Sequence, residues 1–282
     1  MGFQASLPQV SLVLSAISAF TYALPSHLER RVDDVSSDCL YRVPSVGAFT
    51  NHVVYTFTGN TIPSGLNVDT DFIPDQNNYA PYNHIFLASN VAVQDNYLQI
   101  KVPGGQTPST APRNAITSGE VSTVEPNILY ASVRTRAIFG DEPGTCSGSF
   151  FYKGDTQEID LEFLSDPKST ANPHGQSAIH LTNQPTHGGQ SSTTSAAYNS
   201  FGTEREFRID WTPRSTAFYI DGHLERQLID NIPSSPGKWL WNNWSNGNLA
   251  WSAGPPVRDN IMKISSIEMY YNTTDSAHQV CT

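Results

Sequence analysis

Short apolar–polar alternations separated by turn residues run along most of this chain, and they constrain its fold more than any other feature. Val91–Val102 reads as strand, Asp-Asn turn and strand, Ile128–Ile138 is one long alternating run, and Met262–Tyr271 is another. Side chains alternate faces along a strand, so each run can turn one apolar face to a core. We find no internal repeat and no long helical period. About ten to fourteen such strands predict an all-β domain of two packed antiparallel sheets.

The same pattern continues through the middle of the chain. Five further strands are expected, at Gly148–Tyr152, Glu158–Leu164, Ser177–Thr182, Glu206–Trp211 and Ala217–Asp221. Two stretches rich in Gly, Ser, Thr or Pro, residues 103–114 and 187–200, are predicted to be surface loops.

The start of the chain indicates secretion. Residues 1–23 combine a polar start, an apolar run from Val10 to Phe20 and a small residue, Ala23, at a suitable cleavage position. This pattern predicts a secretory signal peptide, although the start carries no Lys or Arg; a buried N-terminal helix is the alternative. Residues 24–38 contain the pair Arg30-Arg31, which indicates either a processed pro-segment or a solvated basic patch. Residues 39–282 are then expected to form a single domain.

The charge and composition of the chain indicate which classes of partner to expect. The net charge is −10 and no basic cluster exists to neutralise phosphates, so we expect no nucleic-acid partner. No second apolar stretch and no lipid-anchor tail is present, so we expect a secreted, extracellular or cell-wall protein without a membrane anchor. The histidines after residue 170, His174, His180 and His187, lack the spacing of a zinc site. We therefore expect no metal and no cofactor, and a monomer.

Three cysteines are present. Cys39 and Cys281 lie at the two ends of the expected domain, and chain termini are often close in space, so we predict a disulfide between them. Cys146 lies in a run that resembles a buried strand, and it is interpreted as a small core residue.

One expected strand contains three acidic residues at alternate positions. In Glu158-Ile-Asp-Leu-Glu-Phe163 the three acids project to one face and the three apolar residues to the other. Like charges this close raise one another's pKa, and Asp and Glu are poor strand formers. A retaining glycosidase needs such paired carboxyl groups, one as nucleophile and one as acid and base. From the spacing alone, a solvated acidic edge or a cation site is an equal alternative.

The residues themselves resemble a known family. Glu158-Ile-Asp-Leu-Glu-Phe-Leu164 is similar to the E-x-D-x-E signature of glycoside hydrolase family 16. Phe207-Arg-Ile-Asp-Trp-Thr-Pro213 and Phe218-Tyr-Ile-Asp-Gly222 resemble its F-x-x-D-W-x-P and W-Y-V-D-G strands. Asn231-Ile-Pro-Ser-Ser-Pro-Gly-Lys238 and Trp241-Asn-Asn-Trp-Ser-Asn-Gly247 resemble two further motifs, N-I-P-S-T-P-G-K and M-N-L-W-N-G. The resemblance implies a concanavalin A-like β-jelly roll with an open glycan cleft.

The resemblance also implies roles. Glu158 corresponds to the nucleophile, Asp160 to its helper and Glu162 to the acid/base. The substrate-contacting residues that it implies are Asn183, Asn242, Trp244 and Trp251. An aromatic ring stacks on the apolar face of a sugar while amides bind its hydroxyls, which suits these residue types. For Trp239, Trp241 and Trp244 core packing is the alternative.

The expected function is a secreted retaining endo-β-glucanase that cleaves β-linked glucan, mixed β-1,3-1,4 or β-1,3/1,4, through a glycosyl-enzyme intermediate. A cell-wall glucan transglycosylase and a non-catalytic glycan-binding module are the alternatives. Lichenase-like members carry an acid in the strand matching Tyr130–Arg136, where this chain has Ser132, and many laminarinases carry E-x-D-x-x-E. Both departures leave the linkage open.

Two sequons are present. Asn272-Thr-Thr is predicted to be glycosylated, whereas Asn243-Trp-Ser overlaps the expected cleft, where burial or strand pairing would prevent glycosylation.

Overall fold

A computed structural model describes residues 40–75, 79–187, 189–197 and 202–274, all of which belong to the unit Val32–Thr282. The expected signal peptide, the segment 24–38 and both cysteines of the expected disulfide, Cys39 and Cys281, lie outside the described residues. No helix within the described ranges is long and apolar enough to cross a membrane.

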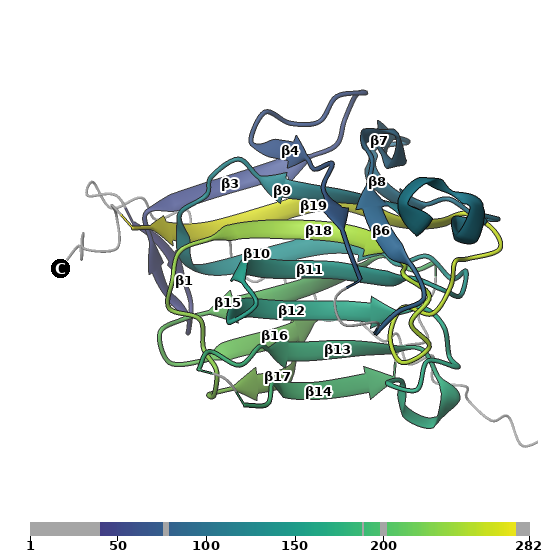
Figure 1. Ribbon diagram of the computed structural model, residues 1–282. Coiled ribbons are helices and arrows are strands. Elements are labelled where there is room, and N and C mark those ends of the chain that lie inside the picture. The colour runs from purple at the N-terminus through teal and green to yellow at the C-terminus, as the bar shows by residue number, and fades with distance from the viewer. Residues whose placement is uncertain (1–39, 76–78, 188, 198–201, 275–282) are drawn as a thin grey trace, which may run out of the picture. The chain divides into compact units, whose positions relative to one another are not determined.

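Two sheets build the fold (Figure 1). The eight-stranded sheet has the order β17 (His223–Leu228), β16 (Thr216–Ile220), β15 (Arg205–Trp211), β10 (Ile128–Ile138), β19 (Asn260–Thr273), β8 (Tyr97–Val102) and β7 (Val91–Gln94), with β3 (Asn51–Thr56) also paired to β19. The nine-stranded sheet has the order β14 (Ser192–Ala197), β13 (Ala178–Asn183), β12 (Gln157–Leu164), β11 (Cys146–Gly154), β18 (Lys238–Trp244), β9 (Ala115–Thr123), β6 (Asn83–Phe86) and β5 (Phe72–Ile73), with β4 (Leu66–Val68) also paired to β9.

The remaining elements are small. β1 (Tyr41–Val43) and β2 (Gly47–Phe49) form a hairpin, and four single 3-10 turns cover Ala88–Asn90, Pro108–Thr110, Pro112–Asn114 and Pro173–Gly175. Among the described strand pairs only β6 and β9 run parallel. The two-sheet antiparallel architecture expected from the sequence is therefore confirmed.

Turn chemistry explains the clearest of the expected strand pairs. Asp95 and Asn96 both take positive φ, 55° and 63°, between β7 and β8. A two-residue turn of this kind matches the twist of a hairpin, and Asp and Asn tolerate its left-handed conformation. Asp221 and Gly222, with φ of 49° and 79°, make the corresponding turn between β16 and β17.

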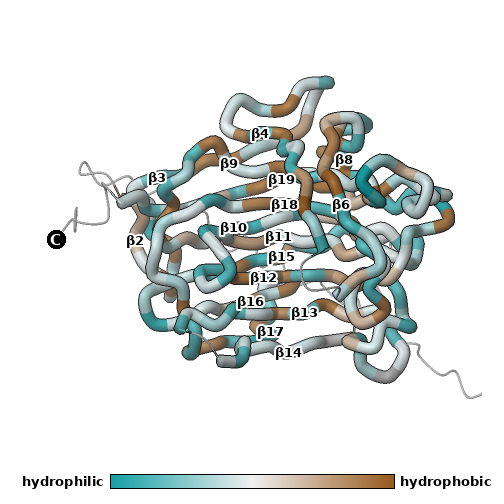
Figure 2. Tube along the Cα trace, in the orientation of Figure 1, coloured by the Kyte–Doolittle hydropathy of each residue, from teal (hydrophilic) through white to brown (hydrophobic). Residues whose placement is uncertain are grey.

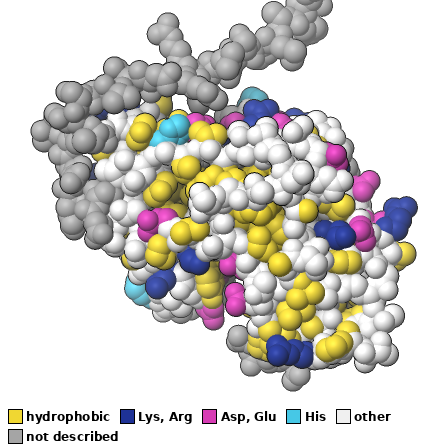
Figure 3. All heavy atoms as spheres, turned by 90° about the horizontal axis from the view of Figure 1, so that it is seen from above, with side chains coloured by type: hydrophobic (Ala, Val, Ile, Leu, Met, Phe, Trp, Pro, Cys, Tyr) yellow, Lys and Arg dark blue, Asp and Glu magenta, His cyan; other side chains and the backbone are white. Residues whose placement is uncertain are grey.

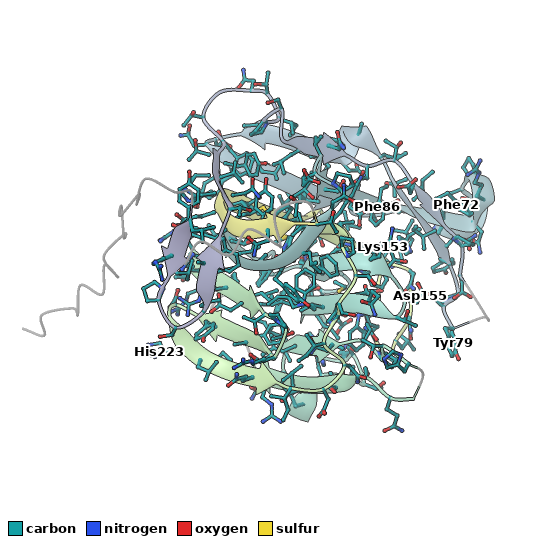
Figure 4. The ribbon with its side chains drawn as sticks, turned by 90° about the vertical axis from the view of Figure 1, so that its left-hand side faces the viewer. Phe72, Tyr79, Phe86, Lys153, Asp155 and His223 are labelled. Carbon is teal, nitrogen blue, oxygen red and sulfur yellow. The ribbon has the colours of Figure 1, made fainter. Side chains whose placement is uncertain are left out.

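The core lies between the two sheets. Apolar positions recur along the central strands in Figure 2, and Ile159, Leu161 and Phe163 of β12 are fully buried. Trp239 and Trp241 of β18 are also fully buried in this core, so these two tryptophans pack in the core rather than line a cleft. Figure 4 looks at the molecule from its side: His223 of the eight-stranded sheet lies on one side, and Lys153 and Asp155 of the β11–β12 turn lie toward the other.

One expected loop is a strand. Residues 192–197, within the stretch predicted as a loop, form β14 and pair antiparallel with β13 at the edge of the nine-stranded sheet. The prediction was wrong because the Ser and Thr residues of this strand show no apolar–polar alternation. On an edge strand that buries little apolar surface, backbone pairing alone defines the strand. The short strands β1 to β6 were also not expected, since two to six residues carry too little pattern.

The surface matches the acidic composition. In the view of Figure 3, Lys and Arg side chains lie singly or in small groups beside Asp and Glu, and they form no continuous basic patch over the described part of that face.

A hydrogen bond between the sheets gives the first testable prediction. The buried Trp241 indole Nε1 of β18 donates to Thr135 Oγ1 of β10 at 2.9 Å. Thr135→Val keeps the shape but leaves the N–H unpaired, which is expected to lower the free energy of unfolding by about 1–3 kcal/mol in urea denaturation. Thr216→Val is the matched control, because the buried Thr216 Oγ1 has no partner among the described residues. Equal losses in both variants would contradict this account.

Candidate active site

Strand β12 holds all three acids of the signature on the side of the nine-stranded sheet that faces away from the core. In the register, Glu158 lies opposite Tyr152, Asp160 opposite Phe150, and Glu162 opposite Gly148. Residues directly opposite each other on paired strands share a face. We call this side of the sheet the acidic face; its central members are Glu158, Asp160 and Glu162.

Asp160 is the most deeply placed of the three. Its side chain is 3% exposed, and Gln184 Nε2 donates to its Oδ2 at 2.8 Å. Burial first, and then the neighbouring Glu158 and Glu162, raise its pKa well above the ordinary value. This environment favours the neutral form of Asp160, whose second oxygen can then donate a hydrogen bond to Glu158.

Glu158 and Asp160 titrate together. Burial and then the charge of Glu162 raise the pKa of Glu158 to about 8, while the hydrogen bond with Asp160 lowers it. A proton on Asp160 favours the ionised form of Glu158, because it supplies a donor where a second charge would repel. The three carboxyl groups thus do not all carry charge at neutral pH.

Glu162 has two donors on one oxygen. Cys146 Sγ donates to Glu162 Oε1 at 3.1 Å, and Trp251 Nε1 donates to the same oxygen at 3.2 Å. Burial raises the pKa of Glu162 and these two hydrogen bonds lower it. Cys146 is thus buried in β11 as expected, but it contacts the acidic trio rather than only the core.

A neutral histidine flanks Glu162. His180 of β13 lies opposite Glu162 in the register, and burial lowers its pKa to about 4. Asn172 Nδ2 donates to the carbonyls of Leu164 and Asp166, so its Oδ1 accepts from His180 Nε2 at 3.1 Å. This network fixes the tautomer of His180 with its proton on Nε2. The indole of Trp251 packs at 4.9 Å from the His180 ring.

The acidic face extends across β18 to β9. Asn242 lies opposite both Gly148 and Glu120, and its Nδ2 donates to Glu120 Oε2 at 3.0 Å. Asn242 Oδ1 is buried and accepts no hydrogen bond from the described residues. Burial raises the pKa of Glu120 to about 8, with a further rise from Asp69 and Asp71.

Trp244 ends β18 on the same side as Asn242. Its indole stacks on the ring of His84 in β6, with centroids 4.9 Å apart and planes at 23°. One face of the indole is thus covered by a neutral imidazole, because burial lowers the pKa of His84 to about 4. Phe72 and Tyr79, in the segment around β5 and β6, stand farther out in Figure 4, on the same side as Lys153.

One expected contact residue does not reach this face. Asn183 lies opposite Ile159, so it points to the core side; it is 0% exposed and its Nδ2 donates to the Asp230 carbonyl at 2.9 Å. The assignment of Asn183 to substrate is corrected by strand parity. The next residue, Gln184, takes the place on the acidic face and bonds Asp160.

Sequence reasoning also missed Glu120 and His180. Glu120 was overlooked because strand β9 was not predicted, and His180 was tested only as a zinc ligand. The register of β9 and β13 against their neighbours is the signal that finds them.

The structure places Ser132 away from the acidic face, and the linkage specificity stays open. Ser132 lies in β10 of the eight-stranded sheet and donates to Asp210 Oδ1 at 2.6 Å. The acidic face belongs to the nine-stranded sheet. The further acid on that face is Glu120 of β9.

The two sequons differ sharply. Asn243 is fully buried and its Nδ2 donates to Ile100 O, Asn260 O and Asn260 Oδ1, so the folded chain offers no room for a glycan there. Asn272 is half-buried, and its Oδ1 accepts from the backbone N–H of Thr50. Glycosylation of Asn272 stays a prediction.

Comparison with known proteins fits this geometry. The model of glycosyl hydrolases family 16 matches residues 78–259, which include all of β12 and β18. The chain belongs to this family.

Curated relatives of this family 16 chain fall in two groups. The beta-glucanase of Bacillus subtilis (strain 168) is 30% identical over 121 residues, 41% of this chain and 47% of that protein. The Crh-like protein 3 of Botryotinia fuckeliana is 24% identical over 247 residues, 80% of this chain and 50% of that protein. The chain thus spans about half the length of these relatives.

Solved structures share the fold. The Bacillus licheniformis beta-glucanase superposes with a TM-score of 0.59 at 20% identity, covering 79% of this chain and 98% of that one. The endo-beta-1,3-glucanase of Pyrococcus furiosus gives 0.62 at 15% identity, covering 83% and 98%. The expected jelly-roll fold is confirmed.

Glu120 gives a prediction about stability and pH. In the unfolded chain it ionises near pH 4.5, whereas the folded protein holds its proton to about pH 8. The stability that this group contributes is therefore full below pH 4.5 and is lost as pH rises toward 8. Glu120→Gln stays neutral, so its unfolding free energy relative to wild type is expected to rise by about 2–4 kcal/mol from pH 5 to pH 8 in urea denaturation.

The control is Glu225→Gln, at an exposed position of β17. Its difference from wild type is expected to be the same at both pH values. A difference for Glu120→Gln that also stays constant would show that Glu120 ionises normally in the folded protein.

Proposed function

We propose that this chain is a retaining glycosidase acting on β-linked glucan, with Glu158 as nucleophile and Glu162 as acid and base. The observation that carries the proposal is the trio on β12: two glutamates flank a buried Asp160, and the hydrogen-bond partners of the two glutamates differ. Glu158 receives a hydrogen bond from Asp160, and Glu162 receives two from Cys146 and Trp251. Different environments for two carboxyl groups are what acid and nucleophile roles require.

In the first step the Glu158 carboxylate attacks the anomeric carbon and the bond to the leaving oxygen breaks. Neutral Glu162 gives its proton to that oxygen. In the second step the Glu162 carboxylate removes a proton from water, whose oxygen attacks the anomeric carbon and releases Glu158. Two displacements leave the anomeric configuration unchanged. Asp160 supports the first step because its hydrogen bond lowers the pKa of Glu158 and so favours the carboxylate that attacks.

A glucan substrate is supported by the residues around the trio. Asn242 has a carbonyl oxygen without a partner among the described residues, and Glu120 is neutral at pH 7 and keeps a carboxyl proton. Trp244 provides an indole next to Asn242. Neutral amides, acids and a ring suit an uncharged sugar with many hydroxyl groups. We also propose that the chain cleaves within the glucan, as the resemblance to family 16 implies. We propose that it is secreted, because residues 1–23 have the pattern of a signal peptide.

The test is product analysis with matched variants. Glu158→Gln and Glu162→Gln are each expected to lower kcat/KM on the preferred β-glucan by about 10³-fold or more, while a cooperative thermal unfolding transition confirms that each variant is folded. Glu225→Gln, a charge-matched change on the exposed surface of β17, is expected to retain full activity. Turnover at the wild-type rate in either active-site variant would end the assignment.

Mass spectrometry of the products separates the modes of action. A panel of β-glucans is incubated with labelled oligosaccharide acceptors. Shorter unlabelled oligosaccharides establish hydrolysis and identify the linkage, whereas label on long chains establishes transfer to a glycan acceptor in the second step. Binding to a glucan without either product would reveal a non-catalytic module and overturn the proposal.

A further inference from the structure

Both hydrogen-bond donors to Glu162, Trp251 and Cys146, contact the same carboxyl oxygen, Oε1. The indole N–H of Trp251 is a donor only, so the oxygen that it contacts, Oε1, must accept. A carboxylic acid carries its proton on one oxygen, and its other oxygen is the stronger acceptor, so donors gathered on Oε1 favour the proton on Oε2. Among the described residues none donates to Oε2.

Cys146 closes the other approach to Oε1. Its side chain is fully buried, and its Sγ lies 3.1 Å from Oε1. Burial and the neighbouring Glu162 raise the pKa of this thiol well above its ordinary value, so it remains S–H and stays a donor. A thiol is small and a weak donor, and β11 presents it on the acidic face directly beside the carboxyl group.

We propose that Cys146 is a positioning residue for Glu162: with Trp251 it occupies Oε1 and so holds the transferable proton of Glu162 on Oε2. This inference rests on the proposed function, since it gives the proton-carrying atom of the acid/base. Fixing the proton on one oxygen orients it before the glycosidic bond breaks, and returns it to the same oxygen in the second step.

Among the described residues, the titratable groups that face Glu162 are Glu158 and Asp160 on β12, Cys146 on β11 and His180 on β13. Asn242 of β18 and Trp251 of the following loop carry no charge. His180 is neutral above about pH 4, so it does not change state where the enzyme is expected to work. A change at residue 146 thus acts on Glu162 through the lost or kept donor, and it also acts on Trp251, whose side chain hydrogen-bonds Cys146.

Three substitutions separate a donor from a packing residue. Cys146→Val and Cys146→Ala both remove the donor, one with added and one with reduced volume, whereas Cys146→Ser keeps an O–H donor. The pKa of Glu162 is measured by ¹³C NMR titration of its carboxyl carbon, assigned by the resonance missing in Glu162→Gln. The alkaline limb of kcat/KM against pH is recorded in parallel, and thermal unfolding confirms that each variant is folded.

The donor role predicts that Val and Ala raise the pKa of Glu162 by about 0.5–1 unit and move the alkaline limb upward by the same amount. Ser is expected to leave both at or below the wild-type value. A packing role predicts the opposite grouping, with Val closest to wild type and no change in the titration.

The outcomes also separate this inference from the proposed function. Equal pKa values in all variants, together with inactive Glu162→Gln, would overturn the positioning role and leave the glycosidase intact. A raised pKa in Val and Ala, together with fully active Glu162→Gln, would overturn the acid/base assignment and leave the thiol–carboxyl interaction standing.

Discussion

The period of two along strand β12 is the constraint on which the rest of the structure depends. It sends Ile159, Leu161 and Phe163 into the core between the sheets and leaves the three acids on the other side. A slip of one residue would bury three carboxyl groups in the core and expose three large apolar side chains. The core therefore fixes the register of the strand, and the register fixes the site.

The second constraint is electrostatic. Three carboxyl groups at alternate positions repel, and partial burial strengthens that repulsion because water no longer screens it. The structure offsets the cost with protons and donors rather than with cations: Gln184 on Asp160, Asp160 on Glu158, and the pair Cys146 and Trp251 on Glu162. Glu120 lies on β9, the strand next to β18, and it likewise has a neutral partner, because Asn242 Nδ2 donates to its carboxyl group. Neutral partners leave the site able to exchange protons at pH values near neutrality.

Much of this was predictable from the sequence, because the informative patterns are local. The alternation in β10, the Asp-Asn turn of β7 and β8, and the face shared by Glu158, Asp160 and Glu162 depend only on spacing, and motif resemblance supplied the roles. What sequence could not supply is cross-strand register. Asn183 and Gln184 are neighbours, yet only the pairing of β12 with β13 decides which one meets Asp160. The same holds for Cys146, whose contact with Glu162 comes from the β11–β12 pairing, and for β14, whose Ser and Thr carry no apolar period.

The central claim is that Glu158, and not its neighbours, forms the bond to the sugar. A glucan oligosaccharide with fluorine at carbon 2 and a reactive leaving group slows the second displacement more than the first, so a retaining enzyme accumulates its covalent intermediate. After a brief incubation, intact mass followed by peptide mapping locates the sugar. The account predicts one sugar unit per chain, on Glu158. An adduct on Asp160 or Glu162, or turnover of the reagent without any adduct, would contradict it.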